Sequence, residues 1–329
     1  MRILVTGGAG FVGSHICEEV IAQGHEPFVL DDLSSGTPDN LPAGVPIHQA
    51  DVRDKEAVEA CFDEVQPQMV CHQAAQMSVS RSVREPVFDA EVNGIGMLHV
   101  LEACVKHDVQ RVTFASSGGV LYGDVYEPAP EDTPASPISP YGITKLLGEQ
   151  YLQFFGREHG LKSVALRYTN VYGPRQNPHG EAGVVAIFAQ TMLKLQVPTI
   201  FGKGDCVRDY VFVQDVARAN VAALFADLQD TFVPINISTE IGTDVNELAE
   251  GIRRCVKLSL AKRNGAAESV LAPKHGPDRA GDLMSNLASH KRAAELLNWT
   301  PQVALNEGLE MTIEWFARKC LDTEQRMGA

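Results

Sequence analysis

The sequence predicts an α/β protein with a doubly wound parallel sheet and a second, smaller mixed α/β lobe. Two observations lead to this prediction. Short apolar runs alternate with helix-length segments over the first half of the chain, and a glycine-rich stretch joins the first run to the first helix. Strand–helix alternation at this spacing makes the strands parallel, because each crossover helix returns the chain to the same edge of the sheet. Ligands are therefore expected beyond the carboxyl ends of the strands.

The apolar runs and the turn residues between them place the elements in order. Strands are predicted at 3–6, 27–30, 46–49, 69–72, 111–115 and 164–167, and helices near 12–24, 54–65, 87–107 and 140–159. Prolines between 128 and 140 mark a surface loop. After residue 170 the pattern becomes irregular, with a turn-rich loop, one helix and a short strand at 199–201. A helix at 215–226 and a strand at 233–236 are expected to rejoin the first sheet, and the remainder is mostly helical.

The composition limits the class of protein. The chain has 329 residues, a net charge of −14, 44% hydrophobic residues and 21% charged residues. Its acidity argues against nucleic acid as a partner, since affinity for phosphate backbones comes from clustered Lys and Arg. No apolar run reaches the length of a membrane span, and the first strand leaves no room for a secretory leader. Seven scattered cysteines without metal-ligand spacing predict a cytoplasmic protein with neither disulfides nor a metal site.

The glycine-rich stretch carries the first functional signal. Gly7, Gly10 and Gly13 allow the tight turn and close backbone approach by which a pyrophosphate rests on the free amides of a helix start. Asp31 ends the second strand, where a carboxylate accepts hydrogen bonds from the ribose hydroxyls and repels a 2′-phosphate, so NAD is favoured over NADP. The sequence therefore predicts a Rossmann NAD-binding domain over residues 1–170, with 212–238 returning to it.

Further cofactor contacts are expected along the same edge of the sheet, because parallel strands bring their carboxyl ends together. These candidates lie at the helix start or follow the second and third strands: Phe11, Val12, Asp32, Ser35, Gly36, Asp51 and Val52. Asp51 is a candidate for the adenine site, and a turn or a helix cap is the alternative for that residue.

A tyrosine and a lysine one helical turn apart are candidates for catalysis. Ser139 and Pro140 are typical of a helix start, so Tyr141 and Lys145 should project from one helix face. A free phenol has a pKa near ~10. One cation at ~4 Å supplies about the 4 kcal/mol that lowers it by ~3 units, and an oxidised nicotinamide is a second cation. Taken alone, such a pair is more often structural than catalytic.

A serine at the end of the strand predicted at 111–115 strengthens this hypothesis. Its hydroxyl would lie at the ligand-binding edge and could bridge Tyr141 and a substrate hydroxyl. Ser116 and Ser117 are both placed for this role, and we favour Ser117. A strand-end serine in a turn is the alternative.

Together, the glycine loop, Asp31, Ser117 and the Tyr141–Lys145 pair resemble the extended short-chain dehydrogenase/reductase family. Within that family the sequence is most similar to the UDP-glucose (UDP-galactose) 4-epimerases, over nearly the whole chain. The stretches that carry this resemblance are HQAAQ at 72–76, LRYTNVYGPR at 166–175, VRDYV at 207–211 and RAGD at 279–282.

The resemblance implies roles for residues in these stretches and a nucleotide-sugar substrate domain formed by 171–211 and 239–329. The residues on the nicotinamide side of NAD would be Ala74, Ala75, Gln76 and Tyr168. Those that bind the UDP-hexose would be Asn170, Phe201, Arg208, Arg279 and Asp282, together with Ser117 and Tyr141. The two arginines would clamp the diphosphate, to which forked guanidinium donors are matched.

The resemblance also implies an isomerase of carbohydrate metabolism that epimerises C4 of UDP-glucose, UDP-galactose or their N-acetylated forms through a transient 4-keto sugar. One alternative on the same fold is a sugar-nucleotide 4,6-dehydratase or a UDP-glucuronate decarboxylase. Such enzymes usually carry acidic residues after the catalytic serine, where this chain has Gly118 and Gly119. A non-catalytic NAD-binding sensor is a minor alternative, since a sensor does not need the serine, tyrosine and lysine.

The sequence departs from its relatives at two positions. Glu91 lies where many relatives have an asparagine, which puts one cofactor contact in doubt. Asn286 lies where some epimerases have a tyrosine that closes the sugar pocket, so N-acetylated hexoses are expected to fit. Family members are commonly homodimers through a helix pair, and the segments at 87–107 and 140–159 are suited to this role.

Overall fold

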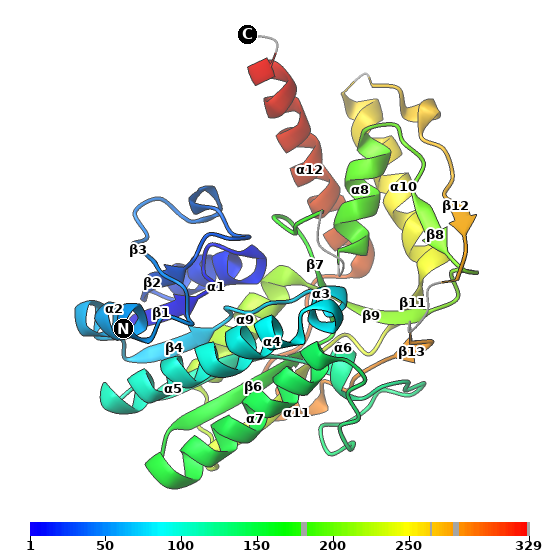
Figure 1. The fold of residues 1–329 in the computed structure, drawn as a ribbon. Coiled ribbons are helices and arrows are strands. Elements are labelled where there is room, and N and C mark those ends of the chain that lie inside the picture. The colour runs from blue at the N-terminus through cyan, green and yellow to red at the C-terminus, as the bar shows by residue number, and fades with distance from the viewer. Residues whose placement is uncertain (179–182, 264, 279–282, 328–329) are drawn as a thin grey trace.

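A seven-stranded sheet in which every pairing is parallel forms the centre of the computed structural model, which describes residues 1–178, 183–263, 265–278 and 283–327 (Figure 1). The strand order is β10-β6-β5-β4-β1-β2-β3. The strands are β1 (Arg2–Thr6), β2 (Glu26–Asp31), β3 (Ile47–Gln49), β4 (Met69–His72), β5 (Arg111–Ser117), β6 (Lys162–Tyr168) and β10 (Phe232–Ile237). The order reverses between β1 and β4, and ligands of doubly wound sheets bind at such a reversal.

Helices cover both faces of this sheet. One face carries α2 (Lys55–Val65), α5 (Met97–Lys106) and α7 (Pro140–His159), and the other carries α1 (Phe11–Ala22), α9 (Val213–Phe225) and α11 (Lys291–Leu297) (Figure 1). Alternate residues of β1 feed the two cores: Leu4 packs towards the first set of helices, and Ile3 and Val5 towards the second. Because successive side chains of a strand point to opposite faces and both faces are covered by helices, most positions are buried and the strands are continuous apolar runs.

The helix predicted near 87–107 differs from the structure. It is divided into α4 (Pro86–Ala90), the π-helix η2 (Glu91–Gly96) and α5. A Cβ atom on Gly96 would lie 2.6 Å from Val52 Cγ2, so glycine lets this segment pass close to the chain after β3. Single-turn π-helices often occur at functional sites.

The second lobe is a set of short strands under three helices. β9 (Val207–Phe212) pairs with β7 (Asn170–Tyr172), antiparallel β11 (Gly242–Asp244) and β13 (Ser285–Asn286), and β8 (Thr199–Phe201) pairs with β12 (Lys274–Gly276). The helices α8 (Val184–Leu193), α10 (Val245–Lys262) and α12 (Leu305–Met327) share one core. The predicted fold class, a doubly wound sheet with a smaller mixed lobe, is confirmed. No helix in the described ranges combines the length and apolar character of a membrane span.

Candidate functional site

The glycine loop after β1 forms a cradle that side chains would fill. Gly7 has φ of +66°, and a Cβ atom there would lie 2.7 Å from the amide nitrogen of Ala74. A Cβ atom on Gly13 would lie 2.3 Å from the carbonyl oxygen of Gly7. Gly10 precedes α1 and contributes no side-chain cap, so amides of the first turn face the loop without a protein side chain. Such a helix start binds a pyrophosphate, and Phe11 and Val12 lie in it.

Asp31 is buried where β2 ends and holds this cradle in place. Its Oδ2 accepts a hydrogen bond from the Ala9 amide at 2.9 Å, and its Oδ1 accepts one from the Leu33 amide at 2.8 Å. Burial raises the pKa of this carboxyl. A Cβ atom on Gly36 would lie 2.7 Å from the carbonyl carbon of Ala9, so the segment that contains Asp32 and Ser35 passes close to the glycine loop.

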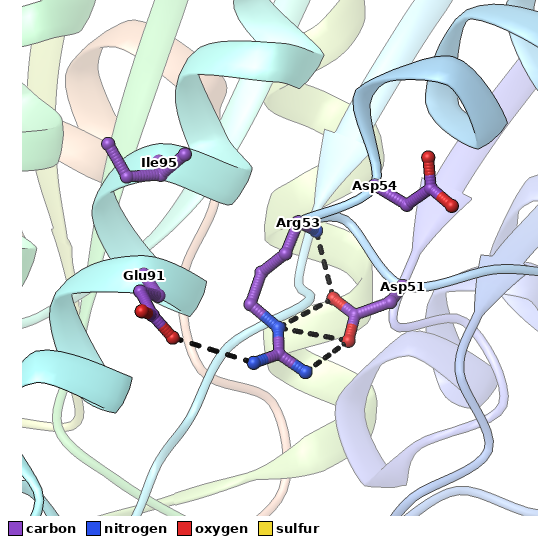
Figure 2. A pocket seen from close by; sticks show the side chains of 5 residues that line it. All are labelled: Asp51, Arg53, Asp54, Glu91 and Ile95. Carbon is purple, nitrogen blue, oxygen red and sulfur yellow. Dashed lines mark hydrogen bonds and ion pairs between the residues drawn. The ribbon is translucent and has the colours of Figure 1, made fainter.

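A pocket of about 410 Å³ opens beyond β3, between the chain after this strand and η2 (Figure 2). It is lined by Asp51, Arg53, Asp54, Glu91 and Ile95. The Arg53 guanidinium donates to both oxygens of Asp51 and lies 3.6 Å from Glu91 Oε2. These bonds hold the pKa of Asp51 below its usual range. Asp51 also accepts from the Arg53 amide at 2.8 Å, so it lines a pocket and closes a turn.

Sequence reasoning missed Arg53, although the Asp-x-Arg spacing was a usable signal. The guanidinium occupies part of the surface that Asp51 would offer to a ligand. Glu91 also lies on this pocket, and Val52 beside it is buried.

Tyr141 and Lys145 lie on one face of α7, as predicted. Ser139 caps this helix, and its Oγ accepts from the backbone of the first turn. The Lys145 ammonium is buried and donates to the carbonyl oxygen of Ala115 at 2.8 Å. It lies 5.5 Å from the centre of the Tyr141 ring and 5.0 Å from that of Phe114. The Lys145 ammonium thereby joins α7 to the end of β5.

The electrostatics of this pair correct one step of the sequence argument. Burial lowers the pKa of Lys145 to about 8. Burial also raises the pKa of the Tyr141 phenol, and the charge of Asp89 raises it further. Of the two cations expected to lower the phenol pKa, Lys145 is present here, and burial of the phenol outweighs the attraction of this one ammonium. The oxidised nicotinamide expected from the sequence would be the second positive charge, and it would act against this desolvation.

The two serines that end β5 have different environments. Ser116 is buried and donates to Glu149 Oε1 at 2.6 Å, and Glu149 is also paired with Arg167 at 2.6 Å. Ser117 is partly exposed, and within the described part of the chain its hydroxyl makes no side-chain hydrogen bond. The geometry therefore supports Ser117 as the hydroxyl available to a ligand.

The residues expected near the nicotinamide lie beyond β4 and at the end of β6. The Ala74 amide donates to Thr6 Oγ1 at 3.2 Å, and Ala75 follows it in the same loop. The Gln76 side chain is engaged within the protein, because its Nε2 donates to Asp89 at 2.7 Å. The buried Tyr168 hydroxyl donates to Asn220 Oδ1 at 3.0 Å.

The expected substrate residues lie in the second lobe or where it meets the sheet. Asn170 donates to the carbonyl oxygen of Asp209 at 3.2 Å. The Arg208 guanidinium donates to the carbonyl oxygen of Leu283 at 2.7 Å, and Phe201 is exposed on β8. Arg279 and Asp282 lie outside the described residues.

Asp89 is a second residue that sequence reasoning missed. It is fully buried beside the first turn of α7 and accepts a hydrogen bond from Thr144 at 2.8 Å. The available signal was the spacing of Asp89 and Asn93, which are one helical turn apart.

Ser116→Ala is expected to lower the free energy of unfolding by about 1–3 kcal/mol, because it removes a buried hydrogen bond from Glu149. Ser117→Ala should leave this free energy nearly unchanged, because no side-chain bond is lost. Urea denaturation of both variants measures the difference. Equal losses in the two variants would contradict the distinction between the serines.

Comparisons with known proteins show the family to which the chain belongs. The model of the NAD dependent epimerase/dehydratase family matches residues 3–237. The UDP-glucose 4-epimerase of Mycolicibacterium smegmatis is 42% identical over 97% of this chain and 99% of its own. The Thermotoga maritima UDP-glucose 4-epimerase structure with UDP-glucose superimposes with a TM-score of 0.89 and 46% identity, over 98% and 100% of the two chains.

A second solved structure, the Thermus thermophilus UDP-glucose 4-epimerase in complex with NAD, has a TM-score of 0.87 and 45% identity. The match covers 96% of this chain and 99% of that one. The family model covers well over half of the chain, and it includes the glycine cradle, Ser117, Tyr141 and Lys145. The chain belongs to the NAD dependent epimerase/dehydratase family.

Proposed function

We propose that this protein epimerises C4 of UDP-hexoses, interconverting UDP-glucose and UDP-galactose with NAD as its cofactor. One observation carries the proposal: the Tyr141–Lys145 face of α7 lies against the end of β5, which carries Ser117. The glycine cradle lies at the same carboxyl edge of the parallel sheet. A proton acceptor and a dinucleotide site therefore share one edge.

The cradle and its surroundings fit NAD. Amides of the first turn of α1 would receive the pyrophosphate, because any side chain on Gly7 or Gly13 would obstruct it. Asp31 would accept from a ribose hydroxyl and would repel a 2′-phosphate. When bound, NAD supplies the oxidised nicotinamide, which takes a hydride from the sugar C4 and returns it, and whose positive charge favours phenolate at Tyr141.

The residues of the chain move and orient the proton. Tyr141 removes the proton of the sugar 4-hydroxyl and later returns it to the same oxygen, after the 4-keto sugar has turned over in the site. Ser117, whose hydroxyl is available, donates to the sugar oxygen and keeps it in line with the phenol. Lys145 holds a positive charge beside the ring, and its bond to Ala115 fixes where that charge lies. The net reaction is an isomerisation.

The nucleotide end of the substrate would be held by the second lobe. Arg208 lies on β9 next to β13 in a parallel register, and Arg279 and Asp282 precede β13 in the sequence. We assign the diphosphate to the two arginines, since guanidinium donors pair with phosphate oxygens. By family resemblance, Asn170 contacts the diphosphate, Phe201 the uracil and Asp282 the uridine ribose.

Dehydration and decarboxylation need a different site. A 4,6-dehydratase requires a second proton-transfer residue, and Gly118 and Gly119, which follow Ser117, have no side chain to provide one. No observation favours these reactions or a sensor without activity. Product mass separates these reactions from epimerisation: dehydration loses water and decarboxylation loses carbon dioxide, whereas an epimer has the mass of its substrate.

Tyr141→Phe is expected to lower kcat by about 10²–10⁴-fold while UDP-galactose binding persists, because only the proton acceptor is lost. Steady-state rates and calorimetric titration measure the two quantities. Tyr126→Phe is the matched control, since Tyr126 is exposed and lies outside the site. Near-normal turnover by Tyr141→Phe would remove Tyr141 from the proposed reaction.

The enzyme is expected to accept UDP-N-acetylgalactosamine as well as UDP-galactose. Asn286 is a small buried residue, and its Oδ1 finds no hydrogen-bond partner within the described residues. Asn286→Tyr should lower kcat/KM for the N-acetylated sugar by at least ~10-fold more than for UDP-galactose, because the larger ring fills the space. Complete rejection of UDP-N-acetylgalactosamine by the unmodified enzyme would refute this expectation.

We further propose a homodimer formed through η2 and α7. One stripe of α7 presents Ile143, Leu147 and Phe154 with exposures of 55%, 37% and 42%, beside Ile95 of η2 at 49%. The three α7 residues repeat at helical spacing, and η2 packs against α7. An apolar stripe of this kind fits the same stripe of a second copy.

Leu147→Glu is expected to halve the mass measured by light scattering after size exclusion, because a charge is buried at the centre of the stripe. Leu258→Glu is the control, because Leu258 is equally apolar and is exposed on α10 in the other lobe. A monomeric unmodified protein, or a Leu147→Glu variant that remains dimeric, would contradict the proposed interface.

A cytoplasmic location accords with the cysteines. Cys17, Cys61, Cys71, Cys104 and Cys255 are buried with free thiols. Burial raises the pKa of each, which keeps them as thiols rather than reactive thiolates. Free buried thiols are typical of a reducing compartment.

A further inference from the structure

Asp89 is a carboxylate buried among neutral donors. Its exposure is 0%. Oδ1 accepts from the amides of Gln76 at 2.7 Å and Asn93 at 3.1 Å, and Oδ2 accepts from the hydroxyl of Thr144 at 2.8 Å. No ion pair to Asp89 is found in the part of the chain that the structure describes. A buried charge without a cationic partner acts strongly on nearby titratable groups.

The contact with Thr144 brings this charge to the reactive helix. Thr144 lies between Tyr141 and Lys145 on α7, and its hydroxyl is also 3.0 Å from the carbonyl oxygen of Tyr141. The charge of Asp89 raises the pKa of both Tyr141 and Lys145. Asp89 therefore opposes the desolvation of the ammonium and adds to the cost of forming the phenolate.

Other charged side chains near α4 have hydrogen-bond or ion-pair partners of their own. On α3 (Val79–Arg84), Arg81 is bonded to Glu85 at 3.1 Å, and Arg84 donates to the Ser80 hydroxyl. The η2 residue Glu91 faces Arg53, as described above. Further along α7, Glu149 is paired with Arg167. Tyr141 and Lys145 are thus the titratable groups that face Asp89 without another charged partner among the described contacts.

We propose that Asp89 is a positioning residue for proton transfer: through Thr144 it fixes the first turn of α7, and its negative charge keeps Lys145 protonated and sets the pH range of the reaction. This inference rests on the proposed function. If the charge is removed, the pKa of Tyr141 and that of Lys145 both fall. The ascending limb of the kcat–pH profile, which requires phenolate, and the descending limb, which requires ammonium, then both move to lower pH.

Asp89→Asn removes the charge and can keep the contacts. The new carboxamide oxygen can accept from Gln76 and Asn93, its NH₂ can donate to the Thr144 hydroxyl, and that hydroxyl can donate to the carbonyl oxygen of Tyr141. We expect both limbs of the profile to move to lower pH by about 0.5–1 unit. An ultraviolet titration of the holoenzyme, with Tyr141→Phe subtracted, should show the same shift in phenolate formation without turnover.

Three variants separate charge from structure. Glu85→Gln removes an exposed carboxylate from the start of α4 and should leave the profile unmoved. Asp89→Glu keeps the charge and should keep both limbs in place even where the longer side chain lowers kcat. Thr144→Val removes the contact but not the charge, so kcat should fall with no shift of the limbs.

The outcomes are distinct. An Asp89→Asn variant that is folded by circular dichroism but has unmoved limbs overturns the proposal, and so does an Asp89→Glu variant whose limbs move as far. If Asp89→Asn does not fold, the pH profiles of Asp89→Glu and Thr144→Val test the proposal. Limbs that stay in place in both variants support it, and limbs that move in either variant overturn it. Failure of the unmodified protein to epimerise would refute the proposed function, whereas the phenolate titration would still test Asp89.

Discussion

The hydrogen bond from the buried Lys145 ammonium to the carbonyl oxygen of Ala115 is the contact on which the site depends. It joins α7, which carries Tyr141, to the end of β5, which carries Ser117. An ammonium in this position is disfavoured by burial, and Asp89 acts in the opposite direction. Burial and Asp89 thus act in opposite directions on an ammonium that lies 5.5 Å from the centre of the Tyr141 ring.

The buried ion pair of Glu149 and Arg167 is a second link between α7 and the sheet. Glu149 lies two helical turns after Tyr141, on the same side of α7, and its contacts with Ser116 and Arg167 bind the helix to β5 and β6. Arg167 also donates to the Tyr122 hydroxyl at 2.9 Å. Breaking a buried pair leaves an uncompensated charge, so the helix and the strand ends are expected to move as one unit.

Much of the fold could be predicted from the sequence, because each central strand is a continuous apolar run and each helix start has its own local signal. The strand at 69–72 and the helix at 140–159 match the structure residue for residue. The short strands β7, β9, β11, β12 and β13 were missed, since each contains polar residues or glycine and none is a continuous apolar run. The division of 87–107 was also missed, because it depends on the close approach of Gly96 to Val52. Local spacing placed Tyr141 and Lys145 correctly, but the pKa of the phenol depends on burial and on Asp89, which are set by contacts distant in sequence.

The central claim is that hydrogen leaves C4 of the sugar and returns to the same carbon within one site. UDP-galactose labelled with deuterium at C4 tests it directly. The account predicts UDP-glucose that retains the label at C4, with unchanged mass and without accumulation of NADH. Loss of the label to solvent, loss of water or carbon dioxide, or stoichiometric NADH would contradict it.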